Sequence, residues 1–336
     1  SMNYTTLIGD SWRLVWRRKS LIALGSLSVL ASILAYVALY IGFIAFFLSS
    51  PSLLIRLMGM PLTEMPEASG GPLGYIAMVL GALAWLLLWL VGLSARGGMI
   101  AAVDAHEDGR SLGAGAAFGR GWSRALTLAA MAIVVFLPVM ILYLITIPLL
   151  FSRFPDLMNA GEAEIMSALM TTQALSCSLS LLIYGLMALL QFIYAFAYRG
   201  VVLGGLGVMA SIRHGWRVLR GNAGDILPLA LIFGGIWFGL IVLWYIAFFV
   251  IYLILLFGLA LGSGDVSLPL TIVAAVGFFI LLLVTLLAGG AQSAWRSAAF
   301  TSGYRYWIAE KKEPAAVEAS PMESADDAPF TDPPTP

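Results

Sequence analysis

The segment 125–151, ALTLAAMAIVVFLPVMILYLITIPLLF, contains no acidic or basic residue. A helix needs about 20 apolar residues to cross the hydrocarbon core of a bilayer, and this segment exceeds that length. Backbone amide and carbonyl groups cannot stay unpaired in lipid, so a segment of this length and composition crosses as a helix. Five other segments have the same character: 21–48, 73–95, 167–198, 226–262 and 268–294. We therefore predict an all-α, polytopic membrane protein with six transmembrane helices.

Charge is scarce and unevenly placed along the chain. Charged residues make up 11% of the sequence, against about 25% in soluble domains. Of the 18 Lys and Arg residues, 16 lie before the first predicted helix, after the sixth, or within 96–124 and 199–225, and only Arg56 and Arg153 lie on the other side. Because loops on the cytoplasmic side are enriched in Lys and Arg, we predict that both termini are cytoplasmic. Membrane lipids are the expected partners, and no nucleic acid is expected.

A short motif containing tryptophan and arginine precedes each odd-numbered predicted helix. Its three copies are Asp10-Ser11-Trp12-Arg13, Arg120-Gly121-Trp122-Ser123-Arg124 and His214-Gly215-Trp216-Arg217. An arginine also follows each even-numbered helix, at Arg96, Arg199 and Arg296, which gives tryptophan-to-arginine separations of 84, 77 and 80 residues. Similar spacing indicates an internal repeat. We predict three tandem helix pairs, about 9–98, 118–200 and 212–297, arranged in parallel around an axis along the membrane normal.

The motif also has a physical role at the membrane boundary. Indole settles at headgroup level, and arginine extends its charged end towards lipid phosphates. We expect six interfacial anchors: Trp12, Arg13, Trp122, Arg124, Trp216 and Arg217. The segments 99–118 and 201–212, which precede two copies of the motif, are too apolar for soluble linkers. We interpret them as amphipathic helices at the inner interface; the alternative, that they extend the second and fourth transmembrane helices, stays open.

The fourth predicted helix carries a stripe of neutral polar residues. Its members recur at separations that keep them on one helix face: Gln173, Ser176, Ser180, Tyr184 and Gln191. Neutral polar groups in hydrocarbon seek partners on neighbouring helices, so we expect this stripe to face the interior of the bundle. Hydrogen bonding between helices is the first interpretation, and a surface that lines a pathway or binds a ligand is the second.

The sequence contains no recognisable catalytic constellation. There is no nucleophile elbow, no His-Glu-x-x-His sequence and no phosphate-binding glycine loop followed by lysine and serine. His106 lies beside Asp104, Glu107 and Asp108, but the run ends in Asp-Gly and is interpreted as a solvated helix end and turn. Metal sites need several ligands that converge from a rigid frame. We therefore expect a protein that is not an enzyme and that has no metal site and no cofactor.

Three motifs of the chain resemble those of a known group of proteins. Residues 11–17, SWRLVWR, 213–222, RHGWRVLRGN, and 302–305, SGYR, are similar to bacterial six-helix proteins related to the membrane domain of some glycerophosphoryl diester phosphodiesterases. The resemblance covers most of residues 9–308. It implies a membrane module in a bacterial cytoplasmic (inner) membrane. It does not imply hydrolysis, because the soluble catalytic barrel of those enzymes has no counterpart here.

Two classes of function follow from these features. A six-helix domain over 1–312, with charge-free helices and a Pro-rich acidic tail at 313–336 that is predicted to be disordered, suits a scaffold, assembly or regulatory module. A transporter or channel for a small neutral or lipid-like solute is the alternative, supported by the repeat and the polar stripe. The sequence does not decide between these two classes.

Overall fold

The computed structural model describes residues 3–49, 72–151, 162–261 and 268–318, and over these residues the chain is helical, with no strand. The helices are α1 (Tyr4–Arg17), α2 (Lys19–Ser49), α4 (Pro72–Glu107), α5 (Ala114–Trp122), α6 (Ala125–Phe151), α8 (Glu162–Gly204), α9 (Val208–Gly221), α10 (Ala223–Leu261) and α11 (Leu268–Glu318). Among them, six are long and apolar enough to cross a membrane: α2, α4, α6, α8, α10 and α11. The predicted all-α, polytopic membrane fold is confirmed.

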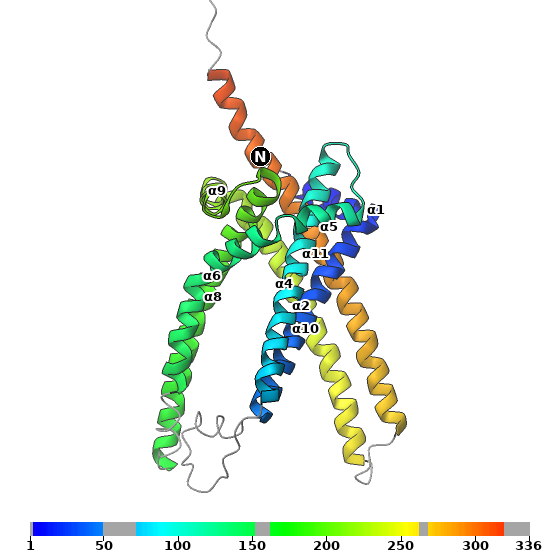
Figure 1. Cartoon of the computed structure of the whole chain (residues 1–336), viewed down its shortest axis with the longest axis vertical. Helices are drawn as coiled ribbons and strands as arrows, with labels where there is room; N and C mark the ends of the chain where they lie inside the picture. Colours follow the sequence, from blue (N-terminus) through cyan, green and yellow to red (C-terminus); the bar gives the residue numbers. More distant parts are fainter. Residues whose placement is uncertain (1–2, 50–71, 152–161, 262–267, 319–336) are drawn as a thin grey trace, which may run out of the picture.

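The order of elements is one short helix followed by two long ones, three times over. In each pair of long helices, the first runs away from the short helices and the second returns to them (Figure 1). The three pairs, α2 with α4, α6 with α8, and α10 with α11, lie close together at one end and diverge towards the other. The pairs therefore share one orientation, as predicted; their superposition by rotation stays a prediction.

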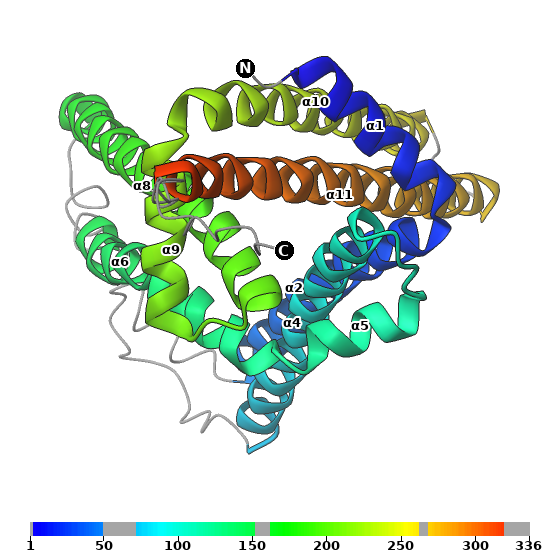
Figure 2. The ribbon, with the colours of Figure 1, turned by 90° about the horizontal axis from the view of Figure 1, so that it is seen from above.

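The three short helices, α1, α5 and α9, lie at the end where the pairs meet, and we call them the collar (Figure 1). Each packs on a returning long helix: α5 on α4, α9 on α8, and α1 on α11. The third contact joins segments far apart in sequence, and in it the indole N–H of Trp295 donates to the carbonyl oxygen of Ile8 at 3.0 Å. Viewed from above, α1 lies over the α10–α11 side of the bundle (Figure 2).

The segments before the anchors contain both structures that the sequence left open. Residues up to Glu107 extend α4 and residues up to Gly204 extend α8, whereas α5 and α9 are separate helices. Each break contains a glycine with positive φ, Gly109 at 72° and Gly205 at 61°. Glycine reaches this backbone region without the steric cost that other residues meet. The predicted Asp-Gly turn after α4 is confirmed.

Buried apolar side chains gather in the collar half of the molecule. Three clusters are centred on the ends of the long helices nearest the collar, and Leu128, Met99 and Trp307 are among their fully buried members. Towards the opposite end, large apolar side chains such as Leu144 and Leu181 are 71% and 74% exposed. Within the described residues the buried clusters therefore lie in the collar half, and the diverging halves present apolar surface to lipid.

Close packing of helices depends on some glycines and not on others. A Cβ atom built on Gly290 of α11 would lie 2.6 Å from the backbone nitrogen of Ser26, and one built on Gly25 of α2 would meet the carbonyl oxygen of Gly290. These two helices approach as small residues permit in membranes. Gly235 and Gly239 of α10 have the same four-residue spacing, yet nothing lies within 4 Å of a Cβ at either position.

The last helix is longer than the predicted domain. α11 continues to Glu318, past the boundary at 312 and into the tail predicted to start at 313. Four of the six residues in 313–318 are alanine or glutamate, which are strong helix formers, and the helix continues through Pro314, which lacks an amide proton. The rest of the predicted tail, 319–336, lies outside the described residues.

Candidate functional site at the collar

The predicted anchors lie on the outer surface of the collar helices. Trp12, Trp122 and Trp216 are 40%, 48% and 46% exposed. The predicted anchor arginines Arg13, Arg124 and Arg217 are exposed as well. The structure thus places all six outside the protein core, where side chains of the collar can reach a membrane surface. Their position at headgroup level stays a prediction.

The small residue before each tryptophan faces the bundle, whereas the tryptophan itself is exposed. Ser11, Gly121 and Gly215 are all buried. A Cβ on Gly121 would lie 2.8 Å from the backbone nitrogen of Gly98, and a Cβ on Gly215 would lie 2.7 Å from that of Ala197. The motif therefore combines a packing position with an exposed aromatic residue. The sequence analysis identified the tryptophan and missed the role of the residue before it.

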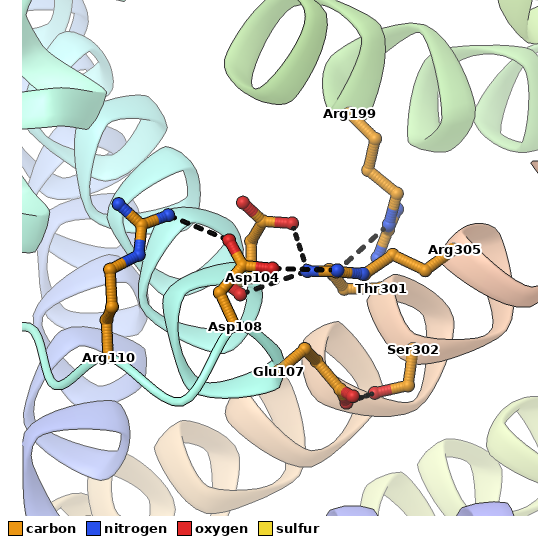
Figure 3. Close-up of polar contacts among 8 residues, drawn as sticks. All are labelled: Asp104, Glu107, Asp108, Arg110, Arg199, Thr301, Ser302 and Arg305. Carbon is orange, nitrogen blue, oxygen red and sulfur yellow. Dashed lines mark hydrogen bonds and ion pairs between the residues drawn. The ribbon is translucent and has the colours of Figure 1, made fainter.

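The acidic run at the end of α4 binds α11 (Figure 3). The Arg305 guanidinium donates to Asp104 Oδ1 at 2.9 Å and to Asp108 Oδ1 at 2.8 Å. Ser302 donates to Glu107 Oε1 at 2.6 Å. The run forms an exposed helix end and turn, as interpreted, and its three carboxylates also fasten α4 to α11 across 195 to 201 positions of sequence.

Two arginines, Arg305 and Arg110, pair with Asp108. Hydrogen bonds from Arg305 and then from Arg110 hold the pKa of Asp108 below its usual value. The adjacent His106 lies with Nδ1 3.0 Å from Nη2 of Arg18. Two pockets, of about 330 and 430 Å³, border His106 between α1 and the end of α4. No group of three or more metal-ligating side chains occurs in the described ranges.

Each returning helix carries one arginine near the collar: Arg96 in α4, Arg199 in α8 and Arg296 in α11. Arg296 of α11 lies within electrostatic reach of both Arg96 of α4 and Arg199 of α8. Arg199 is 5% exposed, whereas Arg96 and Arg296 are exposed. The sequence analysis recorded these arginines only as markers of the repeat. Their regular spacing was visible in the sequence, but which of them approach one another depends on the arrangement of the three helix pairs.

Arg199 is held by neutral groups of α8 and α11. Its guanidinium donates to the carbonyl oxygen of Ala195 at 2.6 Å and, across the interface, to Thr301 Oγ1 and the carbonyl oxygen of Ser297, both at 3.3 Å. Figure 3 shows the side chain reaching from α8 towards Thr301. The guanidinium carbon lies 5.8 Å from the centre of the Phe300 ring, within the range of a cation–π interaction.

The polar stripe on α8 contains both exposed and half-buried side chains. Gln173, Tyr184 and Gln191 are exposed, and Ser176 and Ser180 are half-buried. Gln173 makes a 3.6 Å contact to Cys177 on its own helix. The expectation that the stripe faces the interior of the bundle stays a prediction.

His214 of α9 joins the collar to α11. Its Nε2 atom lies 2.7 Å from the hydroxyl of Tyr304. Burial and then the charge of Arg217 hold the pKa of His214 below its usual value. An interfacial side chain was expected at this position, and the contact with Tyr304 adds a structural role to it.

Acid should therefore loosen this contact. The unfolded chain protonates histidine near pH 6.5 while the folded chain resists protonation, so stability falls as the pH drops from about 6.5 towards 5. We expect a His214→Gln variant to lose part of the difference between the melting temperatures at pH 7.5 and pH 5.5. His106→Gln, at the exposed histidine, is the control. If the His214→Gln variant keeps the wild-type difference between the two melting temperatures, His214 does not cause the loss of stability in acid.

Comparison with known proteins gives no match to the chain, whether with protein-family models, with curated proteins or with solved structures.

Proposed function

We propose that the protein is a non-enzymatic scaffold, assembly or regulatory module of a bacterial cytoplasmic membrane. The observation that carries this proposal is the contrast between the two ends of the molecule. The collar half is packed and cross-connected, whereas the diverging halves of the pairs expose large apolar side chains. Such a shape suits a rigid base whose diverging helices contact other helices within the bilayer, where close packing drives association.

The sidedness of the charge supports the orientation within this proposal. The collar carries the basic residues, and 16 of 18 Lys and Arg belong to segments on that side of the predicted spans. By the positive-inside rule the collar is cytoplasmic, with both termini. The recurring order of short, long and long helices supports an origin from three copies of one unit. The resemblance to membrane domains of bacterial phosphodiesterases also supports a membrane module in a bacterial cytoplasmic membrane.

Crosslinking within the native membrane tests whether the diverging helices contact another protein. A photo-reactive residue at Leu144 or Leu181, both exposed on the diverging halves, should give discrete adducts with another protein. The same residue at Leu128, which is fully buried, is the control. Reporter fusions at the two ends of the chain test the orientation, and activity of a reporter that works only outside the cytoplasm would contradict it.

The alternative is a transporter or channel for a small neutral or lipid-like solute. It is favoured by the exposed stripe on α8, since Gln173 and Gln191 present exposed amide groups. A flux assay in liposomes with a panel of such solutes separates the two. Flux above that of empty liposomes, lost in a Gln191→Leu variant and accompanied by no protein adduct, would replace the first proposal with the second.

A further inference from the structure

The site formed by Arg96, Arg199 and Arg296, the arginine triad, has a charge that the rest of the described chain does not balance. The carboxylates near the collar are engaged elsewhere: Asp104 and Asp108 with Arg305, Glu107 with Ser302, and Asp225 with the hydroxyl of Tyr4. Within the described residues, no ion pair joins the triad to Asp or Glu. Arg96 donates to the Ser28 hydroxyl, a neutral acceptor, at 3.0 Å.

The buried guanidinium of Arg199, with the positive charges of Arg96 and Arg296 nearby, favours a bound anion. Arginine keeps its proton in proteins, so the triad carries three positive charges at the boundary between the apolar core and the collar. Like charges repel more strongly where water is scarce, and a buried charge without a counter-charge is costly. The structure places these groups together despite that cost, and a bound anion is the simplest way to offset it.

The shape of the site indicates which anion. Guanidinium groups present planar pairs of N–H donors that match the oxygen atoms of phosphate, and they form its strongest hydrogen bonds. Arg199 is fixed from behind by Ala195, Ser297 and Thr301, while the exposed Arg96 and Arg296 remain accessible. The triad thus combines one buried, positioned charge with two accessible ones.

A further donor lies beside the triad. Gln292 of α11 is 5% exposed, and its amide nitrogen has no hydrogen-bond partner. It lies four residues before Arg296, hence on the same face of the helix and one turn further from the collar. A buried amide donor without a partner is costly, and an acceptor on a ligand that reaches past the arginines towards the core would satisfy it.

We propose that Arg96, Arg199 and Arg296 form a binding site for a phosphate-bearing anion, with Gln292 as an additional donor to it. Two sources present this chemistry: the headgroup of an anionic phospholipid that enters between the diverging pairs, and a small soluble phosphate compound that enters from the collar. The site is independent of the choice between scaffold and transporter, since either can hold such a ligand. It requires only that the six long helices span a membrane.

Binding to the purified full-length protein tests the site. Phosphatidylglycerol retained by the protein is measured by native mass spectrometry, and protection against thermal unfolding is measured with phosphatidylglycerol or with inorganic phosphate and glycerol phosphate. Loss of one charge-assisted hydrogen bond of about 1.5 kcal/mol corresponds to about a tenfold loss of affinity. We expect that loss in Arg96→Gln and in Arg296→Gln, whose side chains are exposed and whose replacement leaves the core intact.

Arg124→Gln and Arg217→Gln are the matched controls, since both remove an exposed arginine of the collar outside the triad. Arg199→Lys keeps the charge and reports on the buried position. Protection by the lipid alone identifies a headgroup site, and protection by the soluble phosphates identifies a solute site. Wild-type affinity in both Gln variants, or an equal loss in the controls, would overturn the proposal, and either result leaves the crosslinking and flux experiments unaffected.

Discussion

Replacing Gly121 by leucine should separate α5 from α4 and lower the free energy of unfolding by about 3 kcal/mol, the upper end of the usual range for overpacking. Built on Gly121, a Cβ would lie 2.8 Å from the nitrogen of Gly98 and 2.9 Å from the carbonyl carbon of Ser94. Both are backbone atoms, which cannot rotate aside as the end of a side chain would. The whole short helix must therefore move. Unfolding in a denaturing detergent, followed by tryptophan fluorescence, gives the difference.

Gly119 provides the matched control for this variant. It lies in the same helix, and nothing is within 4 Å of a Cβ built there. Gly119→Leu should leave the free energy of unfolding unchanged or raise it by up to about 0.8 kcal/mol through helix propensity. Equal losses in the two variants would mean that the close contact of Gly121 with α4 does not determine the result.

The second large effect is expected between α2 and α11. Gly290→Ala should lower the free energy of unfolding by about 2 kcal/mol, because the new Cβ would lie 2.6 Å from the nitrogen and 2.8 Å from the Cα of Ser26. The substitution is small, and it also raises helix propensity by about 1 kcal/mol. A net loss therefore reports the close approach of the two backbones and not a weaker helix.

The neighbouring Gly289 provides the matched control for Gly290→Ala. A Cβ on Gly289 would lie 3.6 Å from the Cγ atoms of Val29, an ordinary van der Waals contact. Gly289→Ala should leave stability unchanged or raise it by up to about 1 kcal/mol through helix propensity. The same detergent titration measures both variants. A stabilised Gly290→Ala variant would show that the interface between α2 and α11 is looser than described.

Properties that depend on composition and local spacing were predictable from the sequence. The six long helices follow from length and apolarity, and the turn at Gly109 follows from its Asp-Gly pair. The amphipathic nature of α5 and α9 was predictable for the same reason, since helical periodicity is local. Such features depend only on residues within a few helical turns of one another.

Features that depend on neighbours far along the chain were not predictable. The spacing of Gly235 and Gly239 equals that of a packing motif, but no helix approaches these positions, whereas Gly290 meets Gly25. Periodicity placed the residues from Gln173 to Gln191 on one face without saying which helix, if any, covers that face. The meeting of Arg96, Arg199 and Arg296 required the arrangement of all three pairs.

The contact between α1 and α11 has a consequence for biosynthesis. A chain is made from its N-terminus, and segments fold as they emerge. α5 and α9 find α4 and α8 already made, but α1 must wait until the last long helix has been inserted. Until then the face of α1 that carries Leu14 and Val15 is covered only in part, because Ala294 and Ala298 of α11 belong to the same buried cluster. A nascent or truncated protein therefore exposes apolar surface of α1 that α11 covers in the finished protein. Membrane chaperones and proteases bind surfaces of this kind.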